Sequence, residues 1–272
     1  MLTAFLEYSF LKNALFAAVL ASVLCGVVGV IVTEKKMLML SGGIAHTAYG
    51  GVGLGYLLGI EPIFCAAIFS VGAAITIGSL RRKNGVNTDI IISLLWSFGM
   101  ALGIAFTGLM KGYPPDMTFY LFGNILSVTK SDLNIILPLT VIVLVVTVVF
   151  FNDWKAYLFD SRFAKVSGIK TAVLENVLLI LIALSIISMI YVVGIILVIA
   201  LLSAPAACAA QLVKTLKSRM FTAGAFCFVF CFIGLAISYY FGISSGAAIV
   251  FIAVTTYFLI LLAKKVVSNR TN

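Results

Sequence analysis

The sequence has few charged residues. Asp, Glu, Lys and Arg together make up 10% of its 272 residues, whereas hydrophobic residues make up 63%. A soluble domain usually carries about 25% charged residues, because its surface must be hydrated. Long apolar runs recur from one end to the other, and a membrane-spanning helix needs roughly 20 apolar residues in succession. We therefore predict a polytopic integral membrane protein, with residues 1–272 forming a single transmembrane domain.

Catalytic motifs are also lacking. There is no GxxxxGK(S/T) phosphate-binding loop, so any ATP-driven work needs a second polypeptide. The chain has a single histidine, His46, which cannot supply the HExxH motif of a metalloprotease. The five cysteines show no ligand-pair spacing, and we interpret them as small core residues. We predict that the chain is not an enzyme and holds no tightly bound cofactor.

The apolar runs predict an all-α bundle of about eight or nine transmembrane helices. Lipid cannot satisfy the edge of an open sheet, and continuous apolar runs do not match the alternation of a barrel. The predicted spans are 13–33, 37–59, 63–80, 90–110, 133–151, 171–190, 193–213, 221–241 and 247–263. At 191–194, two helices could instead form one long, broken element.

Basic residues are distributed very unevenly among the connecting segments. Alternate segments, beginning with the one that holds Lys35 and Lys36, carry 15 of the 18 basic residues. The positive-inside rule places these segments in the cytoplasm. We therefore predict a cell-membrane protein with its N-terminus outside and its C-terminus inside. The net charge of +9 then reflects topology, and we expect lipid, not nucleic acid, around the chain.

The second predicted span contains both the only histidine and many glycines. His46 lies about nine residues into it, where an ionisable group is costly unless it faces a cavity or a partner. It could contact a metal, since imidazole is a common ligand, or be a hydrogen-bonded structural residue. Gly42 and Gly43 could loosen the helix and act in gating. The glycines could equally serve close helix packing.

The other polar or helix-breaking candidates each have a structural alternative. Asp89 opens the fourth span as a pathway residue or as a helix N-cap. Pro205 removes a backbone hydrogen bond within the seventh span, as a gate or a packing device. On the outer side, Glu61, Asp116 and Asn124 could contact a delivered cation, or be solvated or capping residues.

The longest predicted cytoplasmic loop, NDWKAYLFDSRFAKVSGIK, indicates a short helix. Asp160 is positioned to cap it and Gly168 to end it. Phe159, Phe163 and Val166 recur at helical spacing and give one apolar face. This helix could rest on the membrane surface or fit a groove on a soluble partner.

Several ordered motifs resemble the permease subunits of ABC importers for zinc, manganese and ferrous iron. The resemblance covers about residues 5–265. It is carried by LSGGIAHTAYGGVGLGYLLGIEP, by DIIISLLWSFGMALGI, by FDSRFAKVSGI, and by YVVGIILVIALLSAPAACAAQL. In one respect the sequence departs from the family: the acidic residue usual four positions before the histidine is Gly42.

The resemblance implies a homodimer of permeases docked on two ATPase subunits that bind ATP. An extracytoplasmic binding protein would deliver a divalent metal. His46 and Asp89 match pathway positions, and the loop at about 152–170 matches the region that contacts the ATPase. The alternatives are an ABC permease for a metal chelate such as a siderophore or cobalamin, and an ion-coupled secondary transporter, which would need acidic groups deep in its spans.

Overall fold

The computed structural model describes residues 8–82, 87–112 and 117–271, and regular structure in these ranges is entirely helical. This confirms the predicted all-α membrane bundle. Eight helical segments of the described chain are long and apolar enough to cross a membrane: Ser9–Glu34, Pro62–Arg81, Thr88–Gly108, Lys130–Val149, Thr171–Ile190, Val192–Leu212, Leu216–Phe241 and Ser245–Val266.

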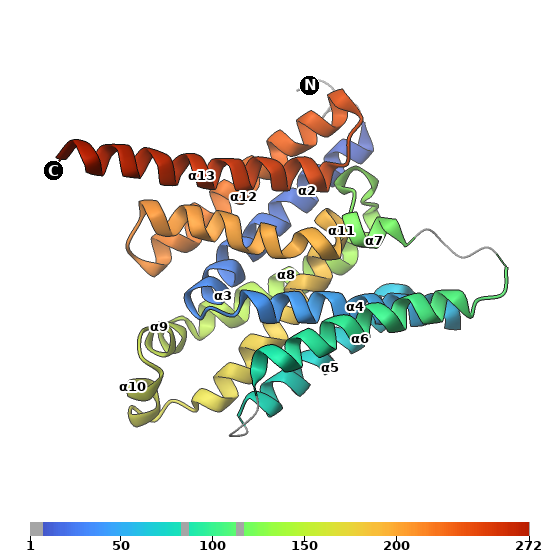
Figure 1. The fold of residues 1–272 in the computed structure, drawn as a ribbon, viewed down its shortest axis with the longest axis horizontal. Helices are drawn as coiled ribbons and strands as arrows, with labels where there is room; N and C mark the ends of the chain where they lie inside the picture. Colours follow the sequence, from blue (N-terminus) through green and yellow to red (C-terminus); the bar gives the residue numbers. More distant parts are fainter. Residues whose placement is uncertain (1–7, 83–86, 113–116, 272) are drawn as a thin grey trace.

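The elements follow the predicted spans closely. In order they are α2 (Ser9–Leu24), the π-helix η1 (Cys25–Gly29), α3 (Val30–Glu34), α4 (Leu38–Leu58), α5 (Pro62–Arg81), α6 (Thr88–Gly108), α7 (Thr118–Phe122), the 3-10 helix η2 (Ile125–Ser127), α8 (Lys130–Val149), α9 (Phe151–Phe159), α10 (Ser161–Val166), α11 (Thr171–Leu212), α12 (Leu216–Phe241) and α13 (Ser245–Thr271). Figure 1 shows α9, α10 and the C-terminal end of α13 at one end of the bundle, and α7 at the other.

The helix α4 is less apolar than the eight spans, yet it lies at the centre of the packing. Its 21 residues correspond to a length of about 31 Å at 1.5 Å per residue. It lies alongside α5 and α6 (Figure 1), and every residue from Leu40 to Gly53 is buried. Burial within the protein lets a helix rich in glycine and hydroxyl groups occupy this position.

Glycine lets α4 meet its neighbours backbone to backbone. A Cβ atom on Gly51 would lie 2.7 Å from the Cα of Ala66 in α5, and one on Gly53 would lie 2.7 Å from the carbonyl oxygen of Gly103 in α6. Such distances exclude any side chain. The packing interpretation of the glycines is therefore confirmed at these positions, while Gly59, with φ of 68°, ends α4.

The predicted weak connection at 191–194 is a sharp break within α11. Gly194 has φ of 76° and ψ of 168°, a conformation open essentially only to glycine. A Cβ atom there would lie 2.6 Å from the carbonyl carbon of Phe122, at the end of α7. Gly123, which ends α7, also has a positive φ of 63°. Two glycines therefore allow the outer loop to pass directly against the break.

Candidate functional site

The imidazole of His46 is held within α4 in one defined tautomer. Its Nδ1 lies 2.9 Å from the carbonyl oxygen of Gly42. A carbonyl can only accept, so Nδ1 carries the proton and Nε2 keeps its lone pair. Nε2 has no hydrogen-bond partner in the described part of the chain, and the residue is 6% exposed. No group of the described chain uses the lone pair of this nitrogen.

The indole of Trp96, on α6, covers the imidazole. The two rings stack with centroids 3.9 Å apart and planes 23° apart. The same indole fills the space above Gly42, where a Cβ atom would lie 2.7 Å from Trp96 Cζ3 and 2.6 Å from Ile199 Cδ1. In this arrangement no acidic side chain fits at position 42. Trp96 and Ile199 occupy the place of the missing carboxylate.

The helix α4 is continuous through Gly42 and Gly43. A Cβ atom on Gly43 would lie 2.8 Å from Cγ2 of Ile92 in α6, so this pair also permits close packing. Pro205 is buried within the second half of α11, which runs on as a helix to Leu212. Gating at these three residues stays a prediction.

The side chain of Asp89 makes no hydrogen bond or ion pair with His46 in the described chain. It is exposed in the first turn of α6, and Asn87, whose Oδ1 accepts the Asp89 N–H at 3.0 Å, is the N-cap. The interpretation of Asp89 as the cap was therefore wrong. In residues 8–82, 87–112 and 117–271, no three His, Cys, Asp or Glu side chains gather as a metal site.

A polar stripe nevertheless starts at Asp89. Ser93 and Ser97 follow it at intervals of four residues, and all three are exposed. Only 17% of the apolar stretch of α6 is buried by the described chain. The Ser93 hydroxyl donates to the Asp89 carbonyl oxygen at 2.8 Å, so the exposed carboxylate of Asp89 is the costly group if this face meets lipid. A role for this face in a polar path stays a prediction.

Two of the three residues predicted on the outer side, Asn124 and Glu61, lie within the described chain. The Asn124 side chain accepts the Leu126 N–H at 3.1 Å and caps η2, and the hydroxyl of Ser245 lies 3.3 Å from the same oxygen. Glu61 precedes α5 and is exposed. Asp116 lies outside the described residues. A role for Asn124 in cation contact stays a prediction.

The predicted short helix of the long loop is confirmed as α10. Asp160 Oδ1 accepts the N–H groups of Arg162 at 2.8 Å and Phe163 at 3.2 Å. The loop turns after the helix at Gly168, whose φ is 86°. On α10, Phe163 is 64% exposed and Val166 is 89% exposed. Phe159, which is 97% exposed, is the last residue of α9, and the extended backbone of Asp160 separates it from α10. The prediction that all three residues share one continuous helix was therefore wrong for Phe159.

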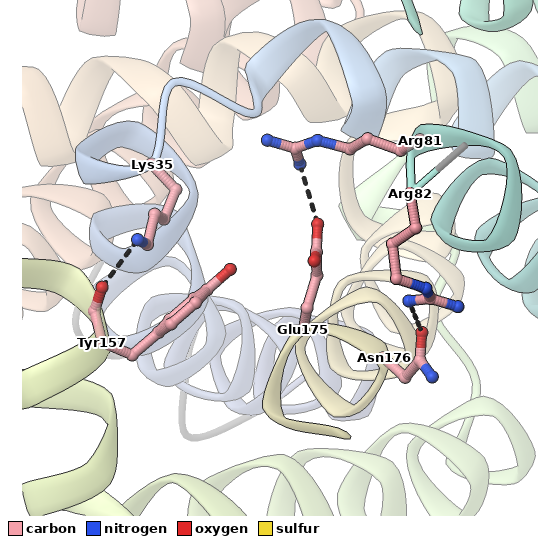
Figure 2. Close-up of polar contacts among 6 residues, drawn as sticks. All are labelled: Lys35, Arg81, Arg82, Tyr157, Glu175 and Asn176. Atoms are coloured by element: carbon pink, nitrogen blue, oxygen red, sulfur yellow. Dashed lines mark hydrogen bonds and ion pairs between the residues drawn. The ribbon is translucent and has the colours of Figure 1, made fainter. Parts of the chain in front are cut away.

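A polar cluster joins α9 of this loop to the connection between α3 and α4, and joins the end of α5 to α11. Figure 2 shows the ammonium group of Lys35, just after α3, directed at the carbonyl oxygen of Tyr157 in α9. The distance is 2.6 Å, and the Nζ also lies 3.7 Å from the Tyr157 ring centroid. In the same view Arg81 faces Glu175, with 3.3 Å between charged atoms, and Arg82 contacts Asn176 at 2.6 Å.

The ammonium group of Lys35 is partly removed from water. Burial, with a smaller contribution from the guanidinium of Arg81, lowers the pKa of Lys35 below its usual value of 10.5. Buried Trp154 and Tyr157 fix α9 against the bundle. The sequence did not predict that Lys35 contacts Tyr157, because nothing in a basic loop identifies a partner 122 residues away.

The comparisons with known proteins agree with this architecture. Residues 7–264 match the family model described as ABC 3 transport family. The chain belongs to the ABC 3 transport family. The resemblance to ABC permeases is thereby confirmed, and the alternative of an ion-coupled secondary transporter is excluded.

Its relatives include named metal transport proteins. The manganese transport system membrane protein MntC of Listeria monocytogenes is 33% identical, over 96% of this chain and 93% of that protein. A probable iron transport system membrane protein of Haemophilus influenzae is 31% identical, over 95% and 94%. The solved structure of PsaBC from Streptococcus pneumoniae in complex with Fab gives a TM-score of 0.86 at 30% identity, over 95% of this chain and 93% of that one.

Proposed function

We propose that this chain is the translocation path of an ABC importer for a divalent transition-metal cation. The observation that carries the proposal is the unbonded Nε2 of His46, held within a buried helix of an ABC transport permease. Relatives named for manganese and for iron transport support a metal as cargo. Imidazole suits several such cations, so the proposal is for this class of cargo.

The proposed mechanism divides the work among several proteins. An extracytoplasmic binding protein delivers the cation, and a separate ATPase subunit binds ATP, since this chain has no phosphate-binding loop. The N-terminus lies outside and the C-terminus in the cytoplasm, as the basic segments favour. In support, α10 and the C-terminal end of α13 lie at the same end of the bundle (Figure 1).

A second copy of the chain completes the path. The polar stripe of Asp89, Ser93 and Ser97 on α6 needs shielding from lipid, and a homodimer would enclose it. The cation would leave His46 and move along this stripe toward the cytoplasm. The contacts must be weak enough for release, which suits a single imidazole better than a closed cage of ligands.

The loop around α10 is the proposed docking point for the ATPase. Phe159 and Phe163 present apolar rings that the described chain leaves uncovered, and a helix with one apolar face fits a groove on a partner. Asp160 and Gly168 fix the ends of that helix. Movement of the ATPase subunits would reach α4 through the contact of Lys35 with Tyr157, and so reach His46.

The test is reconstitution with the ATPase partner in proteoliposomes. We expect ATP-dependent uptake of Mn²⁺, Fe²⁺ or Zn²⁺, compared in separate assays. The His46→Ala variant should assemble with the ATPase but lose uptake, because no nitrogen then meets the cation. Uptake without ATP, or wild-type uptake by the assembled His46→Ala variant, would contradict the proposal.

A further inference from the structure

An apolar groove of about 830 Å³ lies between α2 with η1, the end of α8, and the first half of α12. Its walls include Val19, Val23, Val148, Phe221 and Phe228. Val148 and Phe221 are 64% and 82% exposed, so the groove is open to the surroundings of the bundle. The helices α2 with η1, α8 and α12 are long and apolar enough to span a membrane, so in a bilayer this face meets lipid wherever no other chain covers it.

Glycines form the floor of this α2–α12 groove. A Cβ atom on Gly26, within the π-helix η1, would lie 2.6 Å from the carbonyl oxygen of Met220 and 3.1 Å from the Cα of Gly224. The backbones of η1 and α12 therefore touch, and neither side chain fills the space above them. The floor of the groove is bare backbone because Gly26 and Gly224, which face each other across the two helices, lack side chains.

The hydroxyl groups in the groove are already satisfied. The Ser22 hydroxyl donates to the Ala18 carbonyl at 2.5 Å, and the Thr147 hydroxyl donates to the Val143 carbonyl at 2.8 Å. Both bonds lie within the residue's own helix. The interior thus presents hydrocarbon and bonded hydroxyls to an occupant, which suits an acyl chain and not a polar ligand.

The end of the groove carries an unpaired cation. Lys217 lines it, with Nζ 5.3 Å from the centroid of the Phe151 ring. The ion pairs of the described residues are Arg81–Glu175 and Arg219–Glu34, so no carboxylate there neutralises Lys217. The side chain of Asn152 lines the same end. A long apolar slot with a cation at its mouth matches an anionic amphiphile.

We propose that the α2–α12 groove binds an anionic phospholipid, with one acyl chain in the slot and the phosphate paired with Lys217. Basic groups at the ends of membrane helices attract anionic headgroups, by about 1 kcal/mol per lysine, or roughly fivefold in affinity. The bound chain covers the contact between η1 and α12. The proposal does not depend on the transported substrate.

The test is lipid titration of the full-length protein in detergent, followed by native mass spectrometry. Phosphatidylglycerol and phosphatidylcholine with identical acyl chains are the two probes. Wild-type protein should bind phosphatidylglycerol more tightly. Lys217→Met should reduce phosphatidylglycerol affinity roughly fivefold and leave phosphatidylcholine affinity unchanged. Lys214→Met is the matched control, because Lys214 is exposed three residues earlier and does not line the groove.

A second variant tests the slot itself. Ala225 lines the groove and is exposed, so Ala225→Phe should fill the slot without disturbing the core and weaken both lipids. Equal losses in the Lys217→Met and Lys214→Met variants would overturn the proposal, as would unchanged binding in Ala225→Phe. A dimer that Ala225→Phe abolishes would assign the groove to a second copy of the chain instead.

Discussion

The helices α4 and α10 show opposite uses of side chains. In α4, glycines at 51 and 53 bring backbones into contact, and every residue from Leu40 to Gly53 is buried. In α10 and the residue before its cap, large apolar side chains are left exposed, Phe159 at 97% and Phe163 at 64%. At the contacts of α4 with α5 and α6, the chain uses small residues where backbones meet. It places large ones where its own described residues supply no cover, which is the pattern of a surface for another molecule.

The largest stability effect should come from adding a side chain to the α4–α6 contact. In Gly53→Leu, the new Cβ would lie 2.7 Å from the Gly103 carbonyl oxygen and 2.9 Å from its Cα. Backbone atoms cannot move aside without separating the helices, so we expect a loss of about 3 kcal/mol or more. Thermal unfolding in detergent, together with the yield of folded protein, measures it.

Gly72→Leu is the matched control, because a Cβ on Gly72 in α5 would meet nothing within 4 Å. It should leave stability unchanged or raise it slightly, since leucine favours helix over glycine. Equal melting temperatures for the Gly53→Leu and Gly72→Leu variants would show that α4 is not held by backbone contact.

A smaller loss should follow from restoring the carboxylate that the family usually has. Gly42→Asp places a side chain against Trp96 and Ile199, and crowding of this kind costs about 1–3 kcal/mol. Adding Trp96→Ala should recover part of that loss, because the indole is removed. A double-mutant cycle on melting temperature measures the coupling between the two positions. If the two substitutions change the melting temperature additively, the Trp96 indole is not what excludes a side chain at position 42.

The polar cluster should give a small, pH-dependent effect. The pKa of Lys35 is lowered in the folded protein by burial, so the unfolded chain binds more protons between that lowered pKa and 10.5. Stability contributed by this residue therefore rises as the pH increases through that window. Melting curves from neutral pH toward pH 10.5 should show a rise in wild type that Lys35→Met lacks. Lys36→Met, at an exposed neighbour, should keep the rise.

The smallest stability effect should come from α10. Phe163→Ser removes an exposed ring, so the free energy of unfolding should stay within about 0.5 kcal/mol of wild type. ATP-driven uptake should nevertheless fall, since the proposed docking face is lost. Leu212→Ser, at a residue 55% exposed at the end of α11, should leave both properties unchanged. Normal uptake by the Phe163→Ser variant would remove α10 from the coupling route.

The local features of the fold could be predicted from the sequence. The capped helix from Asp160 to Gly168 is visible there because a cap bonds to N–H groups two or three residues away. The break near Gly194 was visible as a weak connection between apolar runs. The assignment of the N-cap of α6 to Asp89 failed by two residues, because Asn87 was equally able to cap.

The amino-acid sequence by itself determined the class of protein, the approximate positions of the spans, and the capped helix from Asp160 to Gly168, because hydrophobicity and capping act within a few residues. Only the tertiary structure decided that Trp96 stacks on His46 and that its indole fills the space beside Gly42. The hydrogen bond from Lys35 to Tyr157 was likewise decided only there. These contacts join residues 50 to 122 positions apart. Their partners are set by how the helices pack, which no local pattern encodes.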